Sequence, residues 1–383
     1  MSRKGTRAES VRVLQVTQEI GRRSFGLGQV VVNLAKVTQE QGCVAKVWCL
    51  DTADEADWAI GLPEFPGENV SCFTSSRLLG YSISEPMLSA ARTSGVTDVV
   101  HQHGIWTSAS LVTRRFRRLH HLPTVIAPHG ALAKWALQKS RWKKRVALAA
   151  YERENLQQAS CLHAMSDAEV RDFRDCGLSG PIALIPNGVS QRLFDSVGSG
   201  VRFRKEFGVS DHRRIVLFLS RITPKKGLLL LLEAMHRVHE RFPNVILVVA
   251  GPNEFGHLRA VKSQVTHLEL DGIVCFTGPL FDQAKRDAFA ASDVFVLPSY
   301  SEGSPMVVLE CLAAGVPVIT THGTTRSDLR AWECGWWVEI SPDAIARALA
   351  EALTLSEYQL AKMGHRGREM VESSYLWGNW LAG

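Results

Sequence analysis

The sequence predicts an α/β fold of two Rossmann-like domains, each a doubly wound parallel sheet, which face a central cleft. The chain has 383 residues, and at about 150 residues per domain this length favours two domains. Short apolar runs alternate with helical patterns along the chain, which is typical of strand–helix–strand units with right-handed crossovers. The runs contain few polar residues, as expected for strands that are buried on both faces of a parallel sheet.

The expected strands and helices follow from these runs in chain order. In the first half we expect strands at residues 11–16, 44–50, 70–73, 98–103, 124–129, 161–165 and 182–186, with helices between most of them, such as 26–42 and 143–159. In the second half we expect strands at 215–220, 245–251, 273–278, 294–299 and 317–321. A polar segment follows Gly188, so the predicted domains are 1–187 and 188–365. An aromatic-rich C-terminal segment, 366–383, is expected to pack back on the first domain.

Composition excludes several classes of protein. Hydrophobic residues make up 45% and charged residues 21% of the chain, which argues against disorder, collagen or a coiled coil. No apolar run approaches the roughly 18 uncharged residues of a spanning helix, and no signal-peptide-like run follows the charged N-terminus. The eight cysteines include no C-x-x-C pair, which argues against common zinc and thioredoxin-type sites. We therefore expect a soluble, cytoplasmic protein.

Basic residues gather in two places in the first half of the chain. The net charge is +6, and one cluster lies within 114–118 and the other within 141–145. Such clusters favour an anionic partner, namely a nucleotide, a phospholipid surface or a nucleic acid. A solvated helix face explains either cluster alone equally well. The amphipathic stretch 134–145, together with 114–118, suggests peripheral docking on an anionic membrane leaflet at its cytoplasmic side.

Two segments of the second half predict a phosphate and sugar site, because ligands of open parallel sheets bind at the carboxyl ends of the strands. Arg221 and Lys226 follow one expected strand and precede a helix, where two cations and free backbone amides suit a diphosphate. An ordinary surface turn explains these residues equally well. Glu302 follows another strand, and Glu310 lies in the next helix, where its carboxylate could accept from a ribose diol. The amides of Gly303 and Ser304 would be free donors at that helix start.

Histidines and a glycine-rich turn mark the equivalent ends of strands in the first half. His101 and His103 end one expected strand, and His129 ends the next, so parallel neighbours would bring the three together. The alternative is that they are ordinary core or surface histidines whose hydrogen bonds are made within the protein. No acidic residue or cysteine nearby completes a metal site. The first strand–helix turn begins at Gly21 and lacks G-x-G-x-x-G, which argues against a dehydrogenase. P-loop and G-x-S-x-G motifs are also missing.

Taken together, these segments resemble the retaining GT-B glycosyltransferases of family four (glycosyl transferases group 1), including members of exopolysaccharide and lipopolysaccharide assembly. The similarity is carried by SRITPKKG, AGP, FTGPL, the E-x7-E pair within SEGSPMVVLE, and AAGVPVITT, and in the first half by VVHQHGIW, APHGAL and IPNGV. It implies transfer of a sugar from a nucleotide-diphosphate sugar to a glycan or lipid-linked acceptor, with retention of configuration and without a metal or other cofactor.

The resemblance also implies roles for individual residues. Arg221 and Lys226 would hold the diphosphate, Glu310 the ribose, and Glu302 with the Gly303–Ser304 backbone the donor sugar. Gly278 and Leu280 would flank the base. His129 would lie beside the reacting sugar, with His103 as the second choice, and His101 nearby. Gly21, Arg22 and Arg23 would face the acceptor; the family commonly has paired glycines in this loop, so the two arginines here favour an acidic or phosphorylated acceptor.

Other functions are compatible with parts of this pattern. A sugar-nucleotide epimerase or a disaccharide synthase could share the fold and the donor site. A non-catalytic nucleotide-sugar-binding protein would bind without turnover, although Arg221, Lys226, Glu302 and Glu310 together argue against it. No zinc, RRM, KH or helix-turn-helix signature supports specific binding of nucleic acid.

Overall fold

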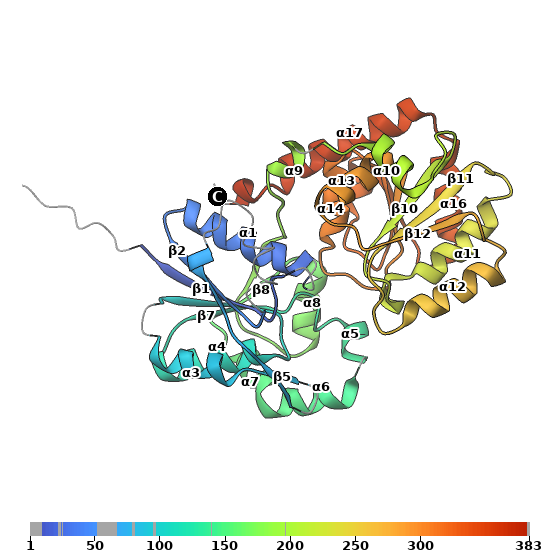
Figure 1. The fold of residues 1–383 in the computed structure, drawn as a ribbon. Coiled ribbons are helices and arrows are strands. Elements are labelled where there is room, and N and C mark those ends of the chain that lie inside the picture. The colour runs from blue at the N-terminus through green and yellow to red at the C-terminus, as the bar shows by residue number, and fades with distance from the viewer. Residues whose placement is uncertain are drawn as a thin grey trace, which may run out of the picture. The chain divides into compact units, whose positions relative to one another are not determined.

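The computed structural model describes residues 10–21, 24, 26–51, 67–78, 81–94, 97–138, 140–195 and 197–380. The chain divides into two compact units. The first comprises residues 1–187 and 380–383, and the second comprises residues 188–379. Each unit contains one large parallel sheet with helices packed on it (Figure 1), so we describe the two units separately.

The first unit has a seven-stranded sheet with the order β3-β2-β1-β6-β7-β8-β9, in which all pairs are parallel. Its strands are β1 (Arg12–Val16), β2 (Val44–Cys49), β3 (Val70–Cys72), β6 (Val99–His103), β7 (Thr124–Ala127), β8 (Cys161–Ala164) and β9 (Ile182–Leu184). A short antiparallel pair, β4 (Ser76–Leu78) and β5 (Tyr81–Ile83), stands apart from this sheet and was not predicted.

Helices of the first unit connect these strands. They are α1 (Gly26–Glu40), α3 (Glu85–Thr93), α4 (Ser108–His120), α5 (Lys134–Gln138), α6 (Arg141–Ala147), α7 (Arg153–Gln157) and α8 (Asp167–Asp175), with a 3₁₀ turn η2 (Gly67–Asn69) and a π-helical turn η3 (Leu148–Glu152). Side chains of Ser84, Thr107 and Ser166 accept hydrogen bonds from first-turn amides and so cap α3, α4 and α8.

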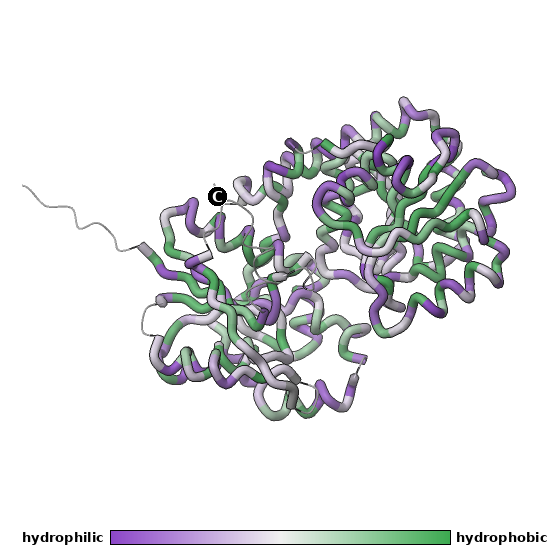
Figure 2. Tube along the Cα trace, viewed as in Figure 1, coloured by the Kyte–Doolittle hydropathy of each residue, from purple (hydrophilic) through white to green (hydrophobic). Residues whose placement is uncertain are grey.

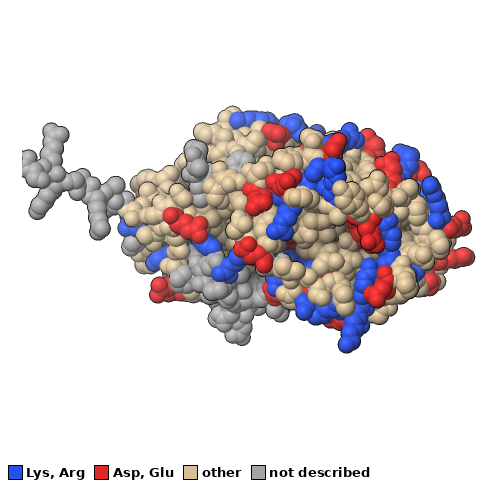
Figure 3. Space-filling view, turned by 90° about the horizontal axis from the view of Figure 1, so that it is seen from above, with Lys and Arg blue, Asp and Glu red and all other residues tan. Residues whose placement is uncertain are grey.

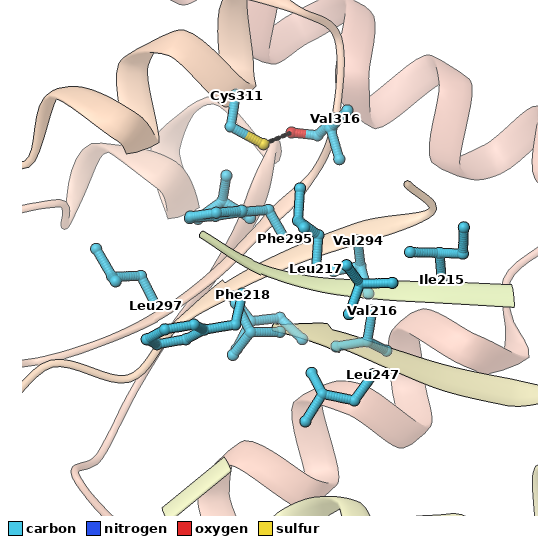
Figure 4. Close-up of a cluster of buried hydrophobic side chains, with 14 of the residues drawn as sticks. Ile215, Val216, Leu217, Phe218, Leu247, Val294, Phe295, Leu297, Cys311 and Val316 are labelled. Atoms are coloured by element: carbon cyan, nitrogen blue, oxygen red, sulfur yellow. Dashed lines mark hydrogen bonds between the residues drawn. The ribbon is translucent and has the colours of Figure 1, made fainter. Parts of the chain in front are cut away.

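The second unit has a six-stranded parallel sheet with the order β12-β11-β10-β13-β14-β15. Its strands are β10 (Arg214–Leu219), β11 (Val245–Ala250), β12 (Val274–Gly278), β13 (Val294–Leu297), β14 (Val318–Thr321) and β15 (Gly335–Val338). Every residue of β11 and β13 is buried, and Figure 2 shows the apolar character of the central strands. Phe218, Leu247 and Phe295 lie in the same core (Figure 4). The strand β15 was not among those predicted.

The helices of the second unit surround this sheet. They are α9 (Arg192–Asp195), α10 (Gly200–Phe207), α11 (Leu228–Val238), α12 (His257–His267), α13 (Asp282–Ala291), α14 (Met306–Ala313), α15 (Asp328–Ala331), α16 (Pro342–Thr354) and α17 (Glu357–Ser374), with 3₁₀ turns η4 (Pro224–Lys226) and η5 (Trp377–Trp380). Helix α17 packs on α14, and the backbone of Val189 pairs with that of Leu376. Residues 366–379 thus belong to the second unit by their contacts.

Both sheets reverse their strand order once, between β1 and β6 in the first unit and between β10 and β13 in the second. Ligands of such sheets bind at the carboxyl ends of the strands that flank this switch point. The two doubly wound parallel sheets confirm the predicted fold class, and they define where each unit is expected to bind its ligand.

Candidate functional site

In the second unit, the loops after β10 and β13 lie against each other at the switch point. Gly227 follows the loop after β10 with φ +69°, and a Cβ there would stand 2.0 Å from the Pro298 carbonyl oxygen. Only glycine permits both this backbone conformation and this approach. The Tyr300 amide also donates to the Lys225 carbonyl oxygen at 2.9 Å. The sequence therefore brings the two loops that carry the predicted cations and carboxylate into direct contact.

Lys226 and Glu302 form an ion pair between these two loops. The Lys226 Nζ donates to Glu302 Oε1 at 2.6 Å, and the side chains are only 10% and 9% exposed. The Glu302 amide donates to the Gly323 carbonyl oxygen, which holds its loop to the one after β14. Burial acts to raise the pKa of Glu302, but the positive charges of Lys226 and Lys225 outweigh it and lower this pKa. The site thus keeps a buried, ionised carboxylate beside an ammonium group.

Two more cations of this edge also have carboxylate partners. The Arg221 Nη1 donates to both carboxylate oxygens of Glu254, each at 3.1 Å. The Lys285 Nζ of α13 donates to Glu310 Oε2 of α14 at 2.8 Å. The sequence indicated Arg221 and Glu310 as site residues but did not indicate their partners Glu254 and Lys285. Each partner is too far along the chain for any motif spacing to connect the two.

The start of α14 offers backbone donors beside this pair. Its N-cap is Pro305 and no side chain caps its first turn, so Gly303 and Ser304 lie before the helix and not in its first turn as predicted. The amides of Met306 and Val307 lack intrahelical partners, whereas the Val308 amide donates to the Pro305 carbonyl oxygen at 3.0 Å. The Thr325 hydroxyl donates to the Gly303 carbonyl oxygen at 2.7 Å, which fixes the turn formed by Gly303 and Ser304. A helix start of this kind favours anions and hydroxyl oxygens.

Gly278 and Leu280 lie at the end of β12. Gly278 has φ +76° and its carbonyl oxygen accepts from the Gly251 amide at 2.8 Å, so it joins the ends of β11 and β12. Leu280 is half-buried and packs against the core of the second unit. Both residues are therefore placed on the other side of the switch point from β14.

In the first unit, the carboxyl ends of β6 and β7 bring the predicted histidines together. The His103 Nδ1 and His129 Nε2 lie 3.0 Å apart, and the rings of His101 and His103 have centroids 4.3 Å apart. His163 of β8, which was not predicted, joins them with Nδ1 at 3.3 Å from His101 Nε2. Burial lowers the pKa of each of these imidazoles, that of His129 to about 3. All four are therefore neutral at physiological pH.

A carboxylate on α8 holds the turn that carries His129. His129 has φ +53°, in the left-handed region that costs a non-glycine residue energy unless its surroundings hold it there. The buried Glu169 accepts hydrogen bonds from the Gly130 amide and, at 2.8 Å, from the Met165 amide. The sequence places a Glu at the third position of α8, but nothing in that spacing indicates this contact.

The first strand–helix turn is held by Asp51 at the end of β2. Its carboxylate accepts from the amides of Ile20 at 2.5 Å and Gly21 at 2.9 Å. Gly21 therefore lies in the loop after β1, beside the end of β2 at the carboxyl edge of the sheet. Arg22 and Arg23, the predicted acceptor-side arginines, lie outside the described residues.

The first basic cluster is engaged in contacts within its own unit. Arg114 and Arg118 both pair with Glu154, Arg115 donates to the Leu88 carbonyl oxygen, and Arg117 donates to Thr124 Oγ1. Burial lowers the pKa of Arg117 to about 10. These contacts hold the cluster on its own unit, and the Arg118 side chain stays 60% exposed. On the face that Figure 3 shows, basic and acidic side chains are interspersed.

Within the described residues, no group of three or more His, Cys, Asp or Glu side chains is arranged to hold a metal ion. No helix among them has the length and apolar character needed to cross a membrane.

Comparison with known families covers most of the chain. Residues 202–370 match the model for glycosyl transferases group 1, and residues 25–188 match the model for a glycosyl transferase 4-like domain. Phosphatidyl-myo-inositol mannosyltransferase of Mycobacterium tuberculosis is 34% identical over 174 residues, which are 44% of this chain and 43% of that protein. An uncharacterized glycosyltransferase of Methanocaldococcus jannaschii is 29% identical over 204 residues, 52% and 51% of the two chains. These alignments span about half the length of the curated relatives.

Solved structures share the fold over nearly the whole chain. HepE from Anabaena, in complex with UDP and glucose, has a TM-score of 0.77 and 19% identity, and the match covers 97% of this chain and 98% of that one. WaaG, a glycosyltransferase involved in lipopolysaccharide biosynthesis, has a TM-score of 0.71 and 17% identity, with coverage of 96% and 97%. These likenesses confirm the GT-B fold.

Proposed function

The chain belongs to the glycosyl transferases group 1 family, and we propose that it transfers a sugar from a nucleotide-diphosphate sugar to a glycan or lipid-linked acceptor. The observation that supports this most directly is the buried Lys226–Glu302 pair, which lies between the loops after β10 and β13 beside the uncapped start of α14. A cation, a carboxylate and free amides at one switch point suit a ligand that carries both phosphate and hydroxyl groups. A nucleotide-diphosphate sugar is such a ligand.

In this proposal the second unit stabilises the departing nucleotide diphosphate. An ammonium group has three donor hydrogens, and the bond to Glu302 uses one of those of Lys226, which leaves others for phosphate oxygens. Arg221 and the first amides of α14 would add positive potential where negative charge develops on the leaving group. Donors fixed by folding need little reorganisation during the reaction, so we propose that these groups serve without a metal ion.

We propose the remaining contacts to the nucleotide sugar from the same edge of the second sheet. The Glu310 carboxylate would accept from the ribose hydroxyls, and its ion pair with Lys285 would hold the side chain in place for this task. Glu302 and the Gly303–Ser304 turn would contact the donor sugar. Gly278 and Leu280 would flank the base.

The first unit would supply the acceptor side, with His129 beside the reacting sugar and His101, His103 and the Gly21 turn nearby. Arg22 and Arg23 would favour an acidic or phosphorylated acceptor. We propose retention of configuration, in which the acceptor oxygen attacks the anomeric carbon on the face that the diphosphate leaves. The bond from that carbon to the phosphate oxygen breaks, and the departing phosphate takes the acceptor's proton. We place the reaction in polysaccharide or cell-surface glycan synthesis.

Thermal unfolding with UDP, GDP and ADP, each with EDTA and then with magnesium, tests the donor site. A nucleotide at about 100 times its Kd adds about 2.7 kcal/mol to the free energy of unfolding, which is a clear shift. We expect one nucleotide to give this shift in EDTA. The proposal fails if no nucleotide shifts the transition, and its metal-independent form fails if a shift requires magnesium.

A disaccharide synthase is a second candidate function. It is favoured by the 34% identity over 151 residues to mannosylfructose-phosphate synthase of Agrobacterium fabrum, which covers 37% of this chain and 33% of that protein. Product analysis with free sugar phosphates and with lipid-linked acceptors separates the two. Incubation of the nucleotide sugar without acceptor tests for epimerisation.

Helix α6 is the part of the first unit that we propose to contact an anionic membrane surface. Trp142 and Val146 are 67% and 58% exposed, and Arg141 and Arg145 are exposed beside them. These four residues are two pairs at i and i+4, so they share one face of the helix. An exposed aromatic with flanking arginines suits the interface of an anionic bilayer.

A further inference from the structure

Four histidines of the first unit form one continuous row across β8, β6 and the turn after β7. His163 lies next to His101, the His101 ring lies on that of His103, and His103 reaches His129. The row begins inside the unit and ends at the half-buried His129, at the carboxyl edge of the sheet. Only three of the four rings were predicted for this edge, and the contacts between them were not.

Two carbonyl oxygens anchor this row. The Ile185 carbonyl oxygen lies 2.9 Å from His163 Nε2, and the Gln15 side-chain oxygen lies 2.7 Å from His103 Nε2. A carbonyl oxygen can only accept, so both of these Nε2 atoms must carry the proton. Gln15 is 1% exposed on β1, where it pairs directly with His101.

The anchors determine the tautomers of the other two rings. A neutral imidazole carries one proton, so the Nδ1 atoms of His163 and His103 are acceptors. His101 must then donate from Nε2 to His163, and His129 must donate from Nε2 to His103. The Nδ1 of His129 is left with a lone pair and has no hydrogen-bond partner among the residues that the structure describes.

We propose that Gln15 and His103 are positioning residues that hold His129 in the Nε2-protonated tautomer, so that its Nδ1 accepts a hydrogen bond from a substrate hydroxyl group. This inference rests on the proposed function, in which His129 lies beside the reacting sugar. Its consequence is selectivity for the ligand's chemistry. A bare imidazole nitrogen attracts a hydroxyl donor and repels phosphate or carboxylate oxygens, so the ligand group at His129 is a sugar hydroxyl.

Long-range ¹H–¹⁵N NMR of the full chain with ¹⁵N-labelled histidine tests the tautomers without any assay of transfer. His129→Gln identifies the His129 signals by their loss. In the wild type we expect a protonated Nε2 and a bare Nδ1 for His129. A protonated Nδ1 in the wild type would show that the Gln15 amide donates rather than accepts, and it would overturn the proposal.

The Gln15→Met variant removes the acceptor for His103 at similar volume. We expect His103 and His129 to become mixtures of both tautomers, with a loss of about tenfold in kcat/KM, which is the rate equivalent of one hydrogen bond. Gln102→Met is the matched control, because Gln102 is equally buried on β6 but bonds to Gly104 and Ser110. It should leave the His129 nitrogen signals unchanged.

The two hypotheses fail in different ways. His129 signals that do not change in Gln15→Met overturn the positioning role. The expected tautomers in a protein that transfers no sugar support the tautomer assignment and overturn the proposed function.

Discussion

At the scale of single residues, the candidate site is a set of ion pairs between loops that are remote in sequence. Arg221, Lys226, Glu302 and Glu310 were predicted from their places after strands or in a helix. The ion pairs that these residues form were not predicted. The sequence indicated only that they lie at the same carboxyl edge of the sheet. Position relative to a strand is a local property that sequence shows. Which carboxylate reaches which cation depends on how the loops pack.

Lys226→Met tests the most buried of these pairs. It leaves the Glu302 carboxylate buried without its partner, and breaking a buried pair in this way costs about 3 kcal/mol of stability. The double variant Lys226→Met/Glu302→Leu should recover most of this loss, because it leaves no unpaired charge. Urea unfolding measures both. Equal stability of Lys226→Met and the wild type would contradict the assignment.

The same pair predicts a dependence of stability on pH. Folding lowers the pKa of Glu302 below its usual value of 4.5, so the unfolded chain binds more protons than the folded one over this interval. The stabilisation is therefore present above pH 4.5 and is lost as the pH falls through the lowered pKa. Urea unfolding between pH 3 and 7, about the range of carboxylate titration, should show a smaller decline for Glu302→Gln than for the wild type.

At the scale of elements, glycines decide how closely the loops of the second unit approach. Gly227 and Gly208 both follow helical turns with similar φ values of +69° and +66°. Sequence alone does not distinguish them, because each is the glycine that such a turn favours. In the folded protein, a Cβ at Gly227 would meet the Pro298 carbonyl oxygen, whereas nothing lies within 4 Å of a Cβ at Gly208.

Gly227→Ala and Gly208→Ala therefore form a matched pair. We expect Gly208→Ala to cost about 1 kcal/mol, from backbone conformation alone. Gly227→Ala adds a clash with backbone, so it should cost at least about 2 kcal/mol more and weaken binding of the nucleotide. Urea unfolding and nucleotide titration measure the two effects. Similar losses in the two variants would show that the contact between the loops after β10 and β13 is not as described.

Helix α6 gives a prediction about surface binding. Trp142→Ala should weaken co-sedimentation with anionic vesicles by about tenfold, because it removes the largest apolar side chain of the exposed face. Tyr358→Ala, which removes an aromatic residue that is 79% exposed on α17, should have no effect. Equal binding of the wild type to neutral and anionic vesicles, or to neither, would exclude this membrane contact.

At the scale of the whole molecule, each unit has apolar cores of its own. One continuous cluster of buried side chains spans the sheet of the second unit and its helices. In the described part of the first unit, the buried side chains form three smaller clusters on the two faces of its sheet. A larger single core buries more apolar surface cooperatively, which favours higher stability of the second unit.

Calorimetry should therefore show two unfolding transitions, with the second unit unfolding at the higher temperature. The nucleotide that binds in the thermal screen should raise this transition and leave the other in place, because the proposed nucleotide contacts lie in the second unit. Proteolysis during heating assigns the transitions by the fragment that survives. A shift of the lower transition alone would place the nucleotide site in the first unit.

The two parallel-sheet domains and the places where ligand-binding loops follow strands were predictable from the amino-acid sequence. Short apolar runs indicate which segments form buried strands and in what order they follow along the chain. For this reason β10, β11 and β13 were predicted close to their observed bounds. The weaker strand β15, with two tryptophans among its four residues, and the short β4–β5 pair gave no such signal. Only the packed structure shows that Lys226 reaches Glu302, that Glu169 holds the His129 turn, and that Gln15 and the Ile185 carbonyl oxygen anchor the histidine row. These contacts depend on strand order and loop packing, which join residues that local patterns treat as independent.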